Sequence, residues 1–453
     1  MTRGAAATGP TARGVARQVR ARVADGAYAT LALAGELDRS GLSAADRALA
    51  TELCYGVLRL RGRLDRALEA CAPRGLGRVD QRVRDALRVA AFQMLCLQRV
   101  PAHAAVNDAV EEVKRLRGPR LAGFANALLR KLARDGEPAA PAPDADPVAF
   151  MVARESYPEW LARLYLAEVG PEEAVAFAAA QNTAAPVWLR ANPARGGRAE
   201  ALRAIAAERP DAELHASPLL PEALRLRGAS SPAELGAFRD GLCTVQDLGA
   251  QAVGRLCGAA PGERILDACA GVGGKSTHLA ELAAGGALID AADRSARKLA
   301  LLIEHARRLG AAGITPVEVD LAAPGARLAA AYDRVLLDAP CTGLGVLRRH
   351  PELKWRREAA DVARLAAVQA QLLGALAPRV RVGGVLVYSV CTVTPAEGAG
   401  QVARFLERHP GFRLEAPDEP AVAPLLDAHG LLRTLPHRHD ADGFVAARLR
   451  RHA

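Results

Sequence analysis

The sequence predicts a multidomain protein: an all-α domain first, a small mixed α/β unit in the middle, and a doubly wound, Rossmann-like α/β domain at the end. The main observation is a change in hydrophobic periodicity, from helical spacing before residue 135 to alternating strands and helices after residue 244. The second is the length of 453 residues, which at about 100 to 200 residues per domain allows two to four domains. Half of the residues are hydrophobic, as expected of a globular chain.

Residues 1–135 form the predicted all-α domain. Apolar residues recur there at i, i+3 and i+4, which is typical of amphipathic helices. The segments with this spacing are 14–25, 44–59, 81–98, 104–117 and 124–134. Proline, glycine and alanine without periodicity then predict a linker over residues 136–148.

The charge of the chain is concentrated in this first part. Residues 1–140 hold 24 Lys and Arg against 14 Asp and Glu, whereas the remainder balances at 36 against 36. A basic domain on a neutral body indicates a polyanionic partner such as nucleic acid. The alternative is a solvated helical surface in an arginine-rich composition, because only five of the 60 basic residues are lysine.

Residues 149–240 predict a small middle subdomain. Two helical stretches fall between residues 157 and 180, and they are followed by a strand at 187–190, a helix at 199–208 and a strand at 223–226. The residues do not reveal its role: a spacer, an RNA-contacting unit and a plain packing module all remain open.

Residues 241–453 alternate strands with helices, which predicts a parallel, doubly wound sheet. The strands are expected at 264–268, 287–292, 315–319, 334–337, 385–388, 412–414 and 444–449, and the helices at 275–284, 296–309, 361–377 and 398–408.

Eight cysteines are present, with no Cys-x-x-Cys pair and no zinc-like spacing, so we expect neither disulfides nor a metal site. Cys341 and Cys391 stand apart because each closes an apolar run, 335–337 and 385–387. Each is therefore expected where a buried strand ends, at the sheet edge that binds ligands in open α/β folds. No apolar stretch approaches the roughly 20 residues of a membrane span, and the start lacks a signal core, so we expect a cytoplasmic protein.

A glycine turn follows the first predicted strand of this domain. Gly271-Val272-Gly273-Gly274 opens a helix, where a closely approaching ligand favours residues without a Cβ. Asp293, at the end of the next strand, can accept hydrogen bonds from ribose hydroxyls or cap the helix that starts near Ser295. The glycines do not fit Gly-x-Gly-x-x-Gly, and Cys269 stands where a P-loop needs glycine.

Several segments together resemble the RsmB (Sun or Fmu) type of ribosomal RNA small-subunit (cytosine-5) methyltransferase, of the NOP2/NSUN-like superfamily. The resemblance covers nearly the whole chain. In the first third, residues 100–110 and 123–130 are similar to a NusB-like RNA-binding domain. In the last part the similar segments are Val245-Gln246-Asp247, Cys269 to Lys275, Asp338 to Cys341, His350 to Trp355 and Ser389 to Thr392.

The resemblance implies S-adenosylmethionine as the cofactor. It assigns cofactor binding to Cys269, Ala270, Gly271, Val272, Gly273, Gly274, Lys275, Asp293, Asp320 and Asp338. Asp293 is expected on the ribose, Asp320 near the adenine, and Lys275 beside both the cofactor and the target base. The chain departs from the family pattern in one place, where Ala270-Gly271-Val272-Gly273-Gly274-Lys275 replaces Ala-Ala-Pro-Gly-Gly-Lys, which predicts a looser turn. For Asp320, a helix-capping or surface role is the alternative.

The chemistry explains why two cysteines are needed. C5 of cytosine is a poor nucleophile, so the ring must first be activated by addition at C6, for which a thiolate is the natural attacker. The resemblance assigns that attack to Cys391, the release of product to Cys341, and a hydrogen bond to the N3/N4 edge of cytosine to Asp338. The catalytic residues are thus expected to be Cys391, Cys341, Asp338 and Lys275.

The expected substrate is unstacked RNA, since the target base must leave its stack to be modified. The resemblance implies the cytosine conventionally numbered 967 of 16S rRNA, modified before the small subunit is fully assembled, by a protein we expect to be a monomer. The alternatives are methylation of transfer RNA or 23S rRNA, and a non-catalytic RNA-binding assembly factor. Basic residues at 348–357 could flank the RNA or form a solvated loop.

Overall fold

The computed structural model describes residues 10–73, 75–98, 100–228, 231–323, 328–417 and 419–453. It separates into two compact units. One unit, the helical unit, contains the residues up to 184 together with 347–357, and the other contains residues 185–346 and 358–453. The division that we expect from the sequence, three domains (1–135, 149–240 and 241–453) with a linker at 136–148, stays a prediction.

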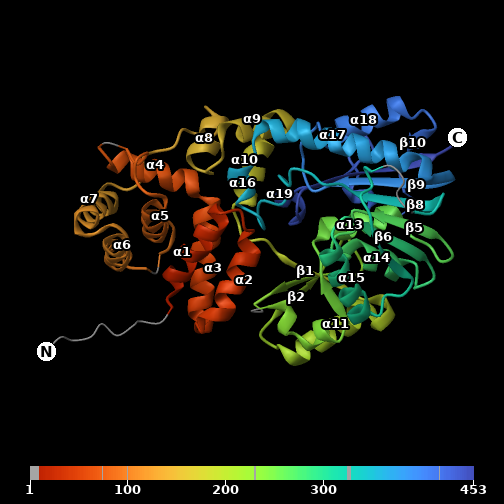
Figure 1. Ribbon diagram of the computed structural model, residues 1–453, viewed down its shortest axis with the longest axis horizontal. Helices are drawn as coiled ribbons and strands as arrows, with labels where there is room; N and C mark the ends of the chain where they lie inside the picture. The colour runs from red at the N-terminus through yellow and green to blue at the C-terminus, as the bar shows by residue number, and fades with distance from the viewer. Residues whose placement is uncertain (1–9, 74, 99, 229–230, 324–327, 418) are drawn as a thin grey trace. The chain divides into compact units, whose positions relative to one another are not determined.

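The regular elements that the structure describes in the helical unit are all helices (Figure 1). They are α1 (Ala12–Ala24), α2 (Ala29–Ser40), α3 (Ala44–Arg59), α4 (Arg61–Cys71), α5 (Gln81–Cys96), α6 (Ala102–Arg117), α7 (Pro119–Asp135), α8 (Pro147–Ala153), α9 (Glu159–Val169), α10 (Pro171–Gln181) and α16 (Leu353–Arg356). The sequence predicted five of them in its first 135 residues and missed α2 and α4. Close packing forms the core: a Cβ on Gly56 of α3 would lie 2.0 Å from the Phe92 ring of α5.

Residues 347–357 pack into the helical unit although they lie far along the chain. Lys354 is 1% exposed, and its Nζ donates to the carbonyl of Arg59 at 2.9 Å and to Asn182 Oδ1 at 2.8 Å. The indole of Trp355 donates to the carbonyl of Leu58 at 2.8 Å. The expectation that this segment is either an RNA-flanking surface or a solvated loop is therefore wrong for Lys354, because its ammonium is buried against backbone carbonyls.

The second unit begins with a small antiparallel sheet in the order β2-β3-β1-β4. Its elements are β1 (Val187–Ala191), α11 (Gly197–Glu208), β2 (Glu213–Ala216), β3 (Ala223–Arg227), α12 (Gly236–Arg239) and β4 (Cys243–Val245). One face packs on α11 through Leu189 and Leu224. The other face, with Trp188 and Ala223, joins the core of the large sheet.

The large sheet follows the order β7-β6-β5-β8-β9-β12-β10, with β11 paired to β12. Its elements are α13 (Leu248–Cys257), β5 (Arg264–Ala268), α14 (Gly274–Leu282), β6 (Leu288–Asp293), α15 (Ala296–Leu309), β7 (Ile314–Glu318), β8 (Tyr332–Asp338), α17 (Ala359–Leu376), β9 (Val380–Val390), α18 (Ala399–Arg408), β10 (Phe412–Leu414), β11 (Leu432–Thr434), α19 (Pro436–His439) and β12 (Phe444–Arg451). Strands β5 to β9 are parallel. The closing strands differ from the predicted parallel sheet, because β12 runs antiparallel to β9 and to β10.

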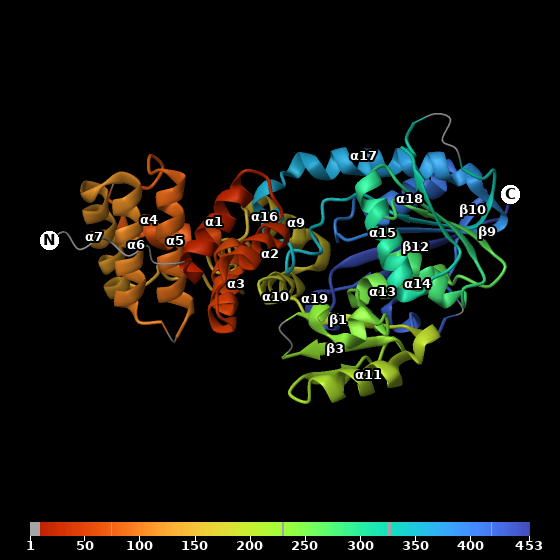
Figure 2. The same cartoon turned by 60° about the horizontal axis from the view of Figure 1, so that its bottom comes forward.

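Helices cover both faces of the large sheet. Figure 2 shows α17 and α18 on one face and α13, α14 and α15 on the other. The small sheet packs on the side of α13 and α14. The parallel strands place their carboxyl ends at one edge, where ligands bind in folds of this kind.

We expect Lys354→Met to lower the free energy of unfolding of the helical unit by about 2–4 kcal/mol, because the buried acceptors around Nζ lose their donor. Denaturant unfolding of the full chain measures the loss, and faster hydrogen exchange in α3 would assign it to this unit. The matched control is Lys114→Met on the exposed face of α6, which should change stability by less than about 0.5 kcal/mol. Equal effects of the two substitutions would contradict the structural role of Lys354.

Candidate active site

The two predicted cysteines lie at the carboxyl edge of the large sheet. Strands β8 and β9 are adjacent and parallel, with Asp338 directly opposite Ser389. The Ser389 hydroxyl donates to Asp338 Oδ1 at 2.7 Å. Cys341 and Cys391 stand three and two residues beyond this pair, so the expectation that each follows a buried strand is confirmed.

The two sulfur atoms are 3.2 Å apart, within hydrogen-bond distance. The hydrogen bond with Cys341 and the burial of the site raise the pKa of the Cys391 thiol well above its usual value. Cys391 is therefore a neutral thiol at neutral pH in the free protein. A neutral thiol is a weak nucleophile, so Cys391 could attack a substrate only after losing its proton.

A buried carboxylate joins the two cysteine loops. Glu397 is 0% exposed and accepts hydrogen bonds from the Thr342 amide at 2.9 Å and hydroxyl at 2.6 Å. It also accepts from the Thr394 hydroxyl at 2.8 Å and the Gln369 amide at 3.0 Å. The sequence analysis missed Glu397, because an acid just before a helix ordinarily reads as a favourable first-turn charge.

The loop after Cys341 passes so close to Cys391 that only glycine fits at one position. The Gly345 amide donates to the Cys391 carbonyl at 3.0 Å. A Cβ on Gly345 would lie 2.0 Å from the Gly443 carbonyl oxygen and 2.9 Å from that of Cys391. The spacing of the two thiols therefore depends on backbone contacts as well as on Glu397.

Lys275 supplies the positive charge of this edge. Its Nζ lies 2.6 Å from Asp338 Oδ2 and 5.4 Å from the centre of the Phe444 ring. Burial alone would lower the pKa of the Lys275 ammonium, but the Asp338 carboxylate outweighs burial and raises that pKa. Lys275 is thus charged and pairs with Asp338 as the sequence analysis expected of residues in one site.

Residues 269–275, here called the glycine turn, connect β5 to α14. Cys269, Gly271 and Gly273 have φ angles of 66°, 58° and 83°, in the left-handed region that favours glycine. A Cβ on Gly273 would lie 2.5 Å from the Leu302 side chain. The turn therefore packs closely against α15 at Gly273, and Cys269 holds a backbone conformation that costs about 1–2 kcal/mol for a residue with a side chain. The looser turn expected from Gly271-Val272 stays a prediction.

A cavity of about 270 Å³ opens beside the glycine turn. Its lining comprises Gln246, Ala250, Asp267, Cys269, Ala270, Gly271, Val272, Gly274, Lys275 and Asp338. Of the ten residues expected to bind the cofactor, seven line this cavity, and Gly273, Asp293 and Asp320 do not.

Asp293 shapes the glycine turn from behind. Its Oδ2 accepts from the Gly271 amide at 3.0 Å, and its Oδ1 accepts from the Ser295 amide at 2.9 Å. The alternative that Asp293 caps the following helix is wrong, since Ser295 is the N-cap of α15. Asp320 follows β7 and accepts from the Ala322 amide at 3.0 Å, so it stabilises a local turn.

Asp267 is a further carboxylate that the sequence analysis missed. It lies in β5, is 0% exposed, and accepts from the Ser276 hydroxyl at 2.6 Å through Oδ2. Oδ1 has no hydrogen-bond partner among the described residues. Burial raises the pKa of Asp267 to about 7, against the opposing effect of the Ser276 hydrogen bond. The available signal was a charged residue inside the apolar strand Ile265-Leu266-Asp267-Ala268.

The sheet order, the glycine turn and the cavity at the carboxyl edge define the second unit as an α/β domain of the methyltransferase fold. A model of the family "16S rRNA methyltransferase RsmB/F" matches residues 257–450. Models of the NusB family and of the RsmF/B-like ferredoxin-like domain match residues 10–134 and 157–232. The chain belongs to the RsmB/F methyltransferase family, as the relatives below also show. The predicted NusB-like helical domain, middle subdomain and Rossmann-like domain are thereby confirmed.

Relatives align over almost the full length. The chain is 36% identical over 428 residues to the probable ribosomal RNA small subunit methyltransferase B of Synechocystis sp., covering 94% of this chain and 95% of that protein. It is 38% identical over 461 residues to the putative methyltransferase Rv1407 of Mycobacterium tuberculosis, covering 98% and 96%. The ribosomal RNA small subunit methyltransferase B of Vibrio vulnificus is 34% identical, with coverage of 81% and 82%.

Solved structures share the fold. The crystal structure of PH0851 matches with a TM-score of 0.82 at 25% identity, covering 98% of this chain and 100% of that chain. NSun6 from Pyrococcus horikoshii, solved with SFG, matches with a TM-score of 0.59 at 23% identity, covering 66% and 99%; the latter shows the fold alone.

None of the helices in the described residues has the length and apolar composition of a membrane span. The same residues contain no cluster of three or more His, Cys, Asp or Glu side chains placed to hold a metal ion.

We expect iodoacetamide to label Cys391 slowly at pH 8, because its thiol pKa lies well above that pH. Cys341→Ala removes the hydrogen bond that raises this pKa, so labelling should become several-fold faster. Peptide mass spectrometry measures the rate. The control is Cys96→Ala in the helical unit, which should leave the rate unchanged. A rate that does not respond to Cys341→Ala would show that burial alone keeps Cys391 protonated.

Proposed function

We propose that the protein transfers a methyl group from S-adenosylmethionine to C5 of a cytosine in 16S rRNA, by resemblance cytosine 967, through a covalent adduct between a cysteine and C6. The observation that carries this proposal is the pair of thiols 3.2 Å apart, next to the ion pair of Lys275 and Asp338. Cytosine-5 chemistry needs one thiol to add to the ring and one group to receive a proton. Membership of the RsmB/F family supports the same reaction.

The cavity suits S-adenosylmethionine because it lies at the carboxyl edge of the sheet and because its acidic residues complement a cationic ligand. This cofactor carries a sulfonium and an ammonium group and supplies an electrophilic methyl. Asp267 offers an oxygen without a partner among the described residues, which suits the ammonium. The glycine turn presents glycine backbone to the ligand. Asp293 on the ribose and Asp320 near the adenine are proposed by resemblance alone, because neither lines the cavity and both carboxylates accept from backbone amides.

The chain's own residues perform the following steps. The Cys391 thiol passes its proton on to N3 as its sulfur bonds to C6 of the cytosine, and Asp338 hydrogen-bonds the N3/N4 edge. C5 then takes the methyl group that the cofactor would supply, and the cofactor would leave as S-adenosylhomocysteine with the electron pair of the broken methyl–sulfur bond. Cys341, acting as a thiolate, takes the C5 proton, the C6–S bond breaks with its electron pair returning to Cys391, and the proton on N3 returns to that sulfur. Lys275 keeps Asp338 in place and offsets negative charge beside the thiols.

The helical unit is proposed to bind the RNA around the target. Its surface carries exposed Arg120, Arg130 and Arg134 on α7, and the first 140 residues hold the whole excess of basic charge. Phosphate contacts of this kind position an RNA without reading its sequence. We propose an unstacked cytosine in 16S rRNA before full subunit assembly as the substrate, and a monomeric cytoplasmic enzyme that needs no metal.

The reaction is tested by methyl transfer from labelled S-adenosylmethionine to unmodified 16S rRNA. Wild type should label one cytosine, and Cys391→Ala should be inactive because no adduct forms. Cys341→Ala should accumulate an RNA–protein adduct that survives denaturation, since the adduct cannot collapse. The double variant should form no adduct, which serves as the control.

Three outcomes would change the proposal. Methylation by Cys391→Ala would show that another residue attacks the base. Labelling of transfer RNA or 23S rRNA but not of 16S rRNA would keep the chemistry and change the substrate. RNA binding by wild type without any transfer would indicate a non-catalytic assembly factor.

Asp267 makes cofactor binding depend on pH. Its pKa of about 7 in the free protein means that the carboxylate is largely protonated at pH 6 and largely ionised at pH 7.5. Affinity for the cofactor's ammonium should therefore rise up to about eight-fold over this interval and level off above it. Calorimetry measures the affinity, and Asp267→Asn should bind more weakly with this rise removed. An unchanged pH profile in Asp267→Asn would place the ammonium elsewhere.

A further inference from the structure

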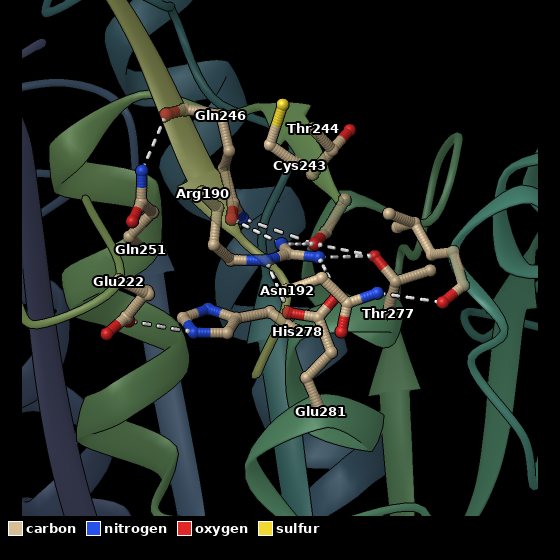
Figure 3. Close-up of polar contacts among 12 residues, drawn as sticks. Arg190, Asn192, Glu222, Cys243, Thr244, Gln246, Gln251, Thr277, His278 and Glu281 are labelled. Atoms are coloured by element: carbon tan, nitrogen blue, oxygen red, sulfur yellow. Dashed lines mark hydrogen bonds and ion pairs between the residues drawn. The ribbon is translucent and has the colours of Figure 1, made fainter. Parts of the chain in front are cut away.

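Arg190 of the small sheet reaches α14, where it contacts Thr277 and Glu281 (Figure 3). Its guanidinium is 0% exposed, and all five N–H groups have acceptors. Nε and Nη2 bind the two carboxylate oxygens of Glu281, each at 2.8 Å. Nη2 also donates to Thr277 Oγ1 at 3.0 Å, and Nη1 donates to the Gly274 carbonyl at 2.8 Å and to Gln246 Oε1.

Gln246 completes the same arrangement from the neighbouring strand. Strands β1 and β4 pair so that Arg190 lies opposite Thr244, and Gln246 follows two residues later. Its Nε2 donates to the Gly274 carbonyl at 3.2 Å. The Gly274 carbonyl therefore accepts from two side chains outside the large sheet, both of which are fixed by strand pairing.

We propose that Arg190 is a positioning residue for the cofactor site: it fixes the Gly274 carbonyl and thereby the glycine turn and the side chain of Lys275. The inference rests on the proposed function and assigns the middle subdomain a role that the sequence left open. Gly274 directly precedes Lys275, so a shift of its carbonyl moves the residue whose Nζ lies 2.6 Å from Asp338. Gln246, the second donor to this carbonyl, itself lines the cavity.

The chemistry of the Arg190–Glu281 pair favours a role in positioning the glycine turn over a role in stabilising the fold. Burying an Arg–Glu pair carries a desolvation cost that apolar packing would avoid. A fully satisfied guanidinium, however, fixes several acceptors in one plane. The turn needs such an anchor, because Cys269, Gly271 and Gly273 all hold left-handed backbone angles.

The residue directly after β1 contacts the end of α15. Asn192 Nδ2 donates to the Leu309 carbonyl, the last residue of α15, at 2.8 Å and to the Gly241 carbonyl at 3.0 Å. Arg190 in β1 and Asn192 just after it thus contact both α14 and α15. The small sheet contacts the two helices that follow the glycine turn and Asp293.

The test compares Arg190→Lys with Arg334→Lys. Arg334 makes a bidentate pair with Glu263 at the opposite end of the parallel strands, with its Nη2 at 2.8 Å from Oε1. Both variants keep the charge and lose the planar fork. We expect both to lower the melting temperature, whereas only Arg190→Lys should raise the Kd of S-adenosylhomocysteine, by about ten-fold, and speed hydrogen exchange of amides 270–276.

Thr277→Val serves as a milder second variant should Arg190→Lys fail to fold. It removes the hydroxyl that accepts from Arg190 and donates to the Gly273 carbonyl at 2.8 Å. This variant should fold, and it should show a smaller rise in the Kd of S-adenosylhomocysteine and a smaller increase in hydrogen exchange of amides 270–276. Equal Kd and equal exchange of residues 270–276 in the variants and in wild type would overturn the positioning role.

The two proposals fail separately. If wild type binds no S-adenosylhomocysteine, the proposed function falls, but faster exchange of the glycine turn in Arg190→Lys would still support positioning. If wild type binds it and neither variant changes affinity or exchange, positioning falls and the proposed function stands.

Discussion

The register of β8 and β9 is the constraint on which the active site depends. Because the strands are parallel neighbours with Asp338 opposite Ser389, the chain after each strand emerges at the same edge. Two loops that are fifty residues apart then run side by side, and their cysteines come within 3.2 Å. A shift of one residue would turn Asp338 to the opposite face of the sheet. The strand pairing sets the approximate distance between the two sulfur atoms, and the contacts of Glu397 and Gly345 adjust it.

Acidic side chains outnumber basic ones around the glycine turn at the carboxyl edge of the large sheet. Asp267, Asp293 and Asp338 surround the glycine turn, and Lys275 pairs with Asp338. Lys298 lies 3.9 Å from Asp293 but is largely exposed. Burial raises the pKa of Asp267 to about 7, although the Ser276 hydrogen bond and the Lys275 charge both lower it. A cationic ligand at this place would relieve an electrostatic cost that the fold retains.

The sequence predicted the parts of the site that carry local signals. Cys341 and Cys391 each close an apolar run, and the glycines between 271 and 274 mark a turn. Glu397 and Arg190 carry no such signal, because their roles depend on partners distant in the chain, whereas Asp267 is marked by a charge inside an apolar strand. Arg190, for example, lies 91 residues from Glu281. An arginine in a short strand suggests an exposed side chain. Only the structure shows that this face of the small sheet packs against the helices of the large sheet.

The fold shows the same limit. Periodicity located most helices and strands of the large sheet, often within two residues, since each is long enough to repeat its pattern. It missed α4, whose stripe of Leu64, Ala67, Leu68 and Cys71 includes small residues that weaken the pattern. Lys354 was misread for a different reason. A lysine next to arginines in the sequence suggests an exposed side chain. Only the tertiary structure shows that the Lys354 ammonium donates to three protein oxygen atoms instead of to water.

The protonation state of Cys391 depends, through Lys275, on the contacts that Arg190 and Gln246 make with the Gly274 carbonyl. The hydrogen bond and charge interaction with Cys341, burial and the Asp338 charge raise its thiol pKa, and the Lys275 charge opposes them. The Lys275 Nζ is held 2.6 Å from Asp338 Oδ2. That position follows from the Gly274 carbonyl, which Arg190 and Gln246 hold from the small sheet. A substitution at Arg190 should therefore affect cofactor affinity first and, through Lys275, the reactivity of a thiol that it does not touch.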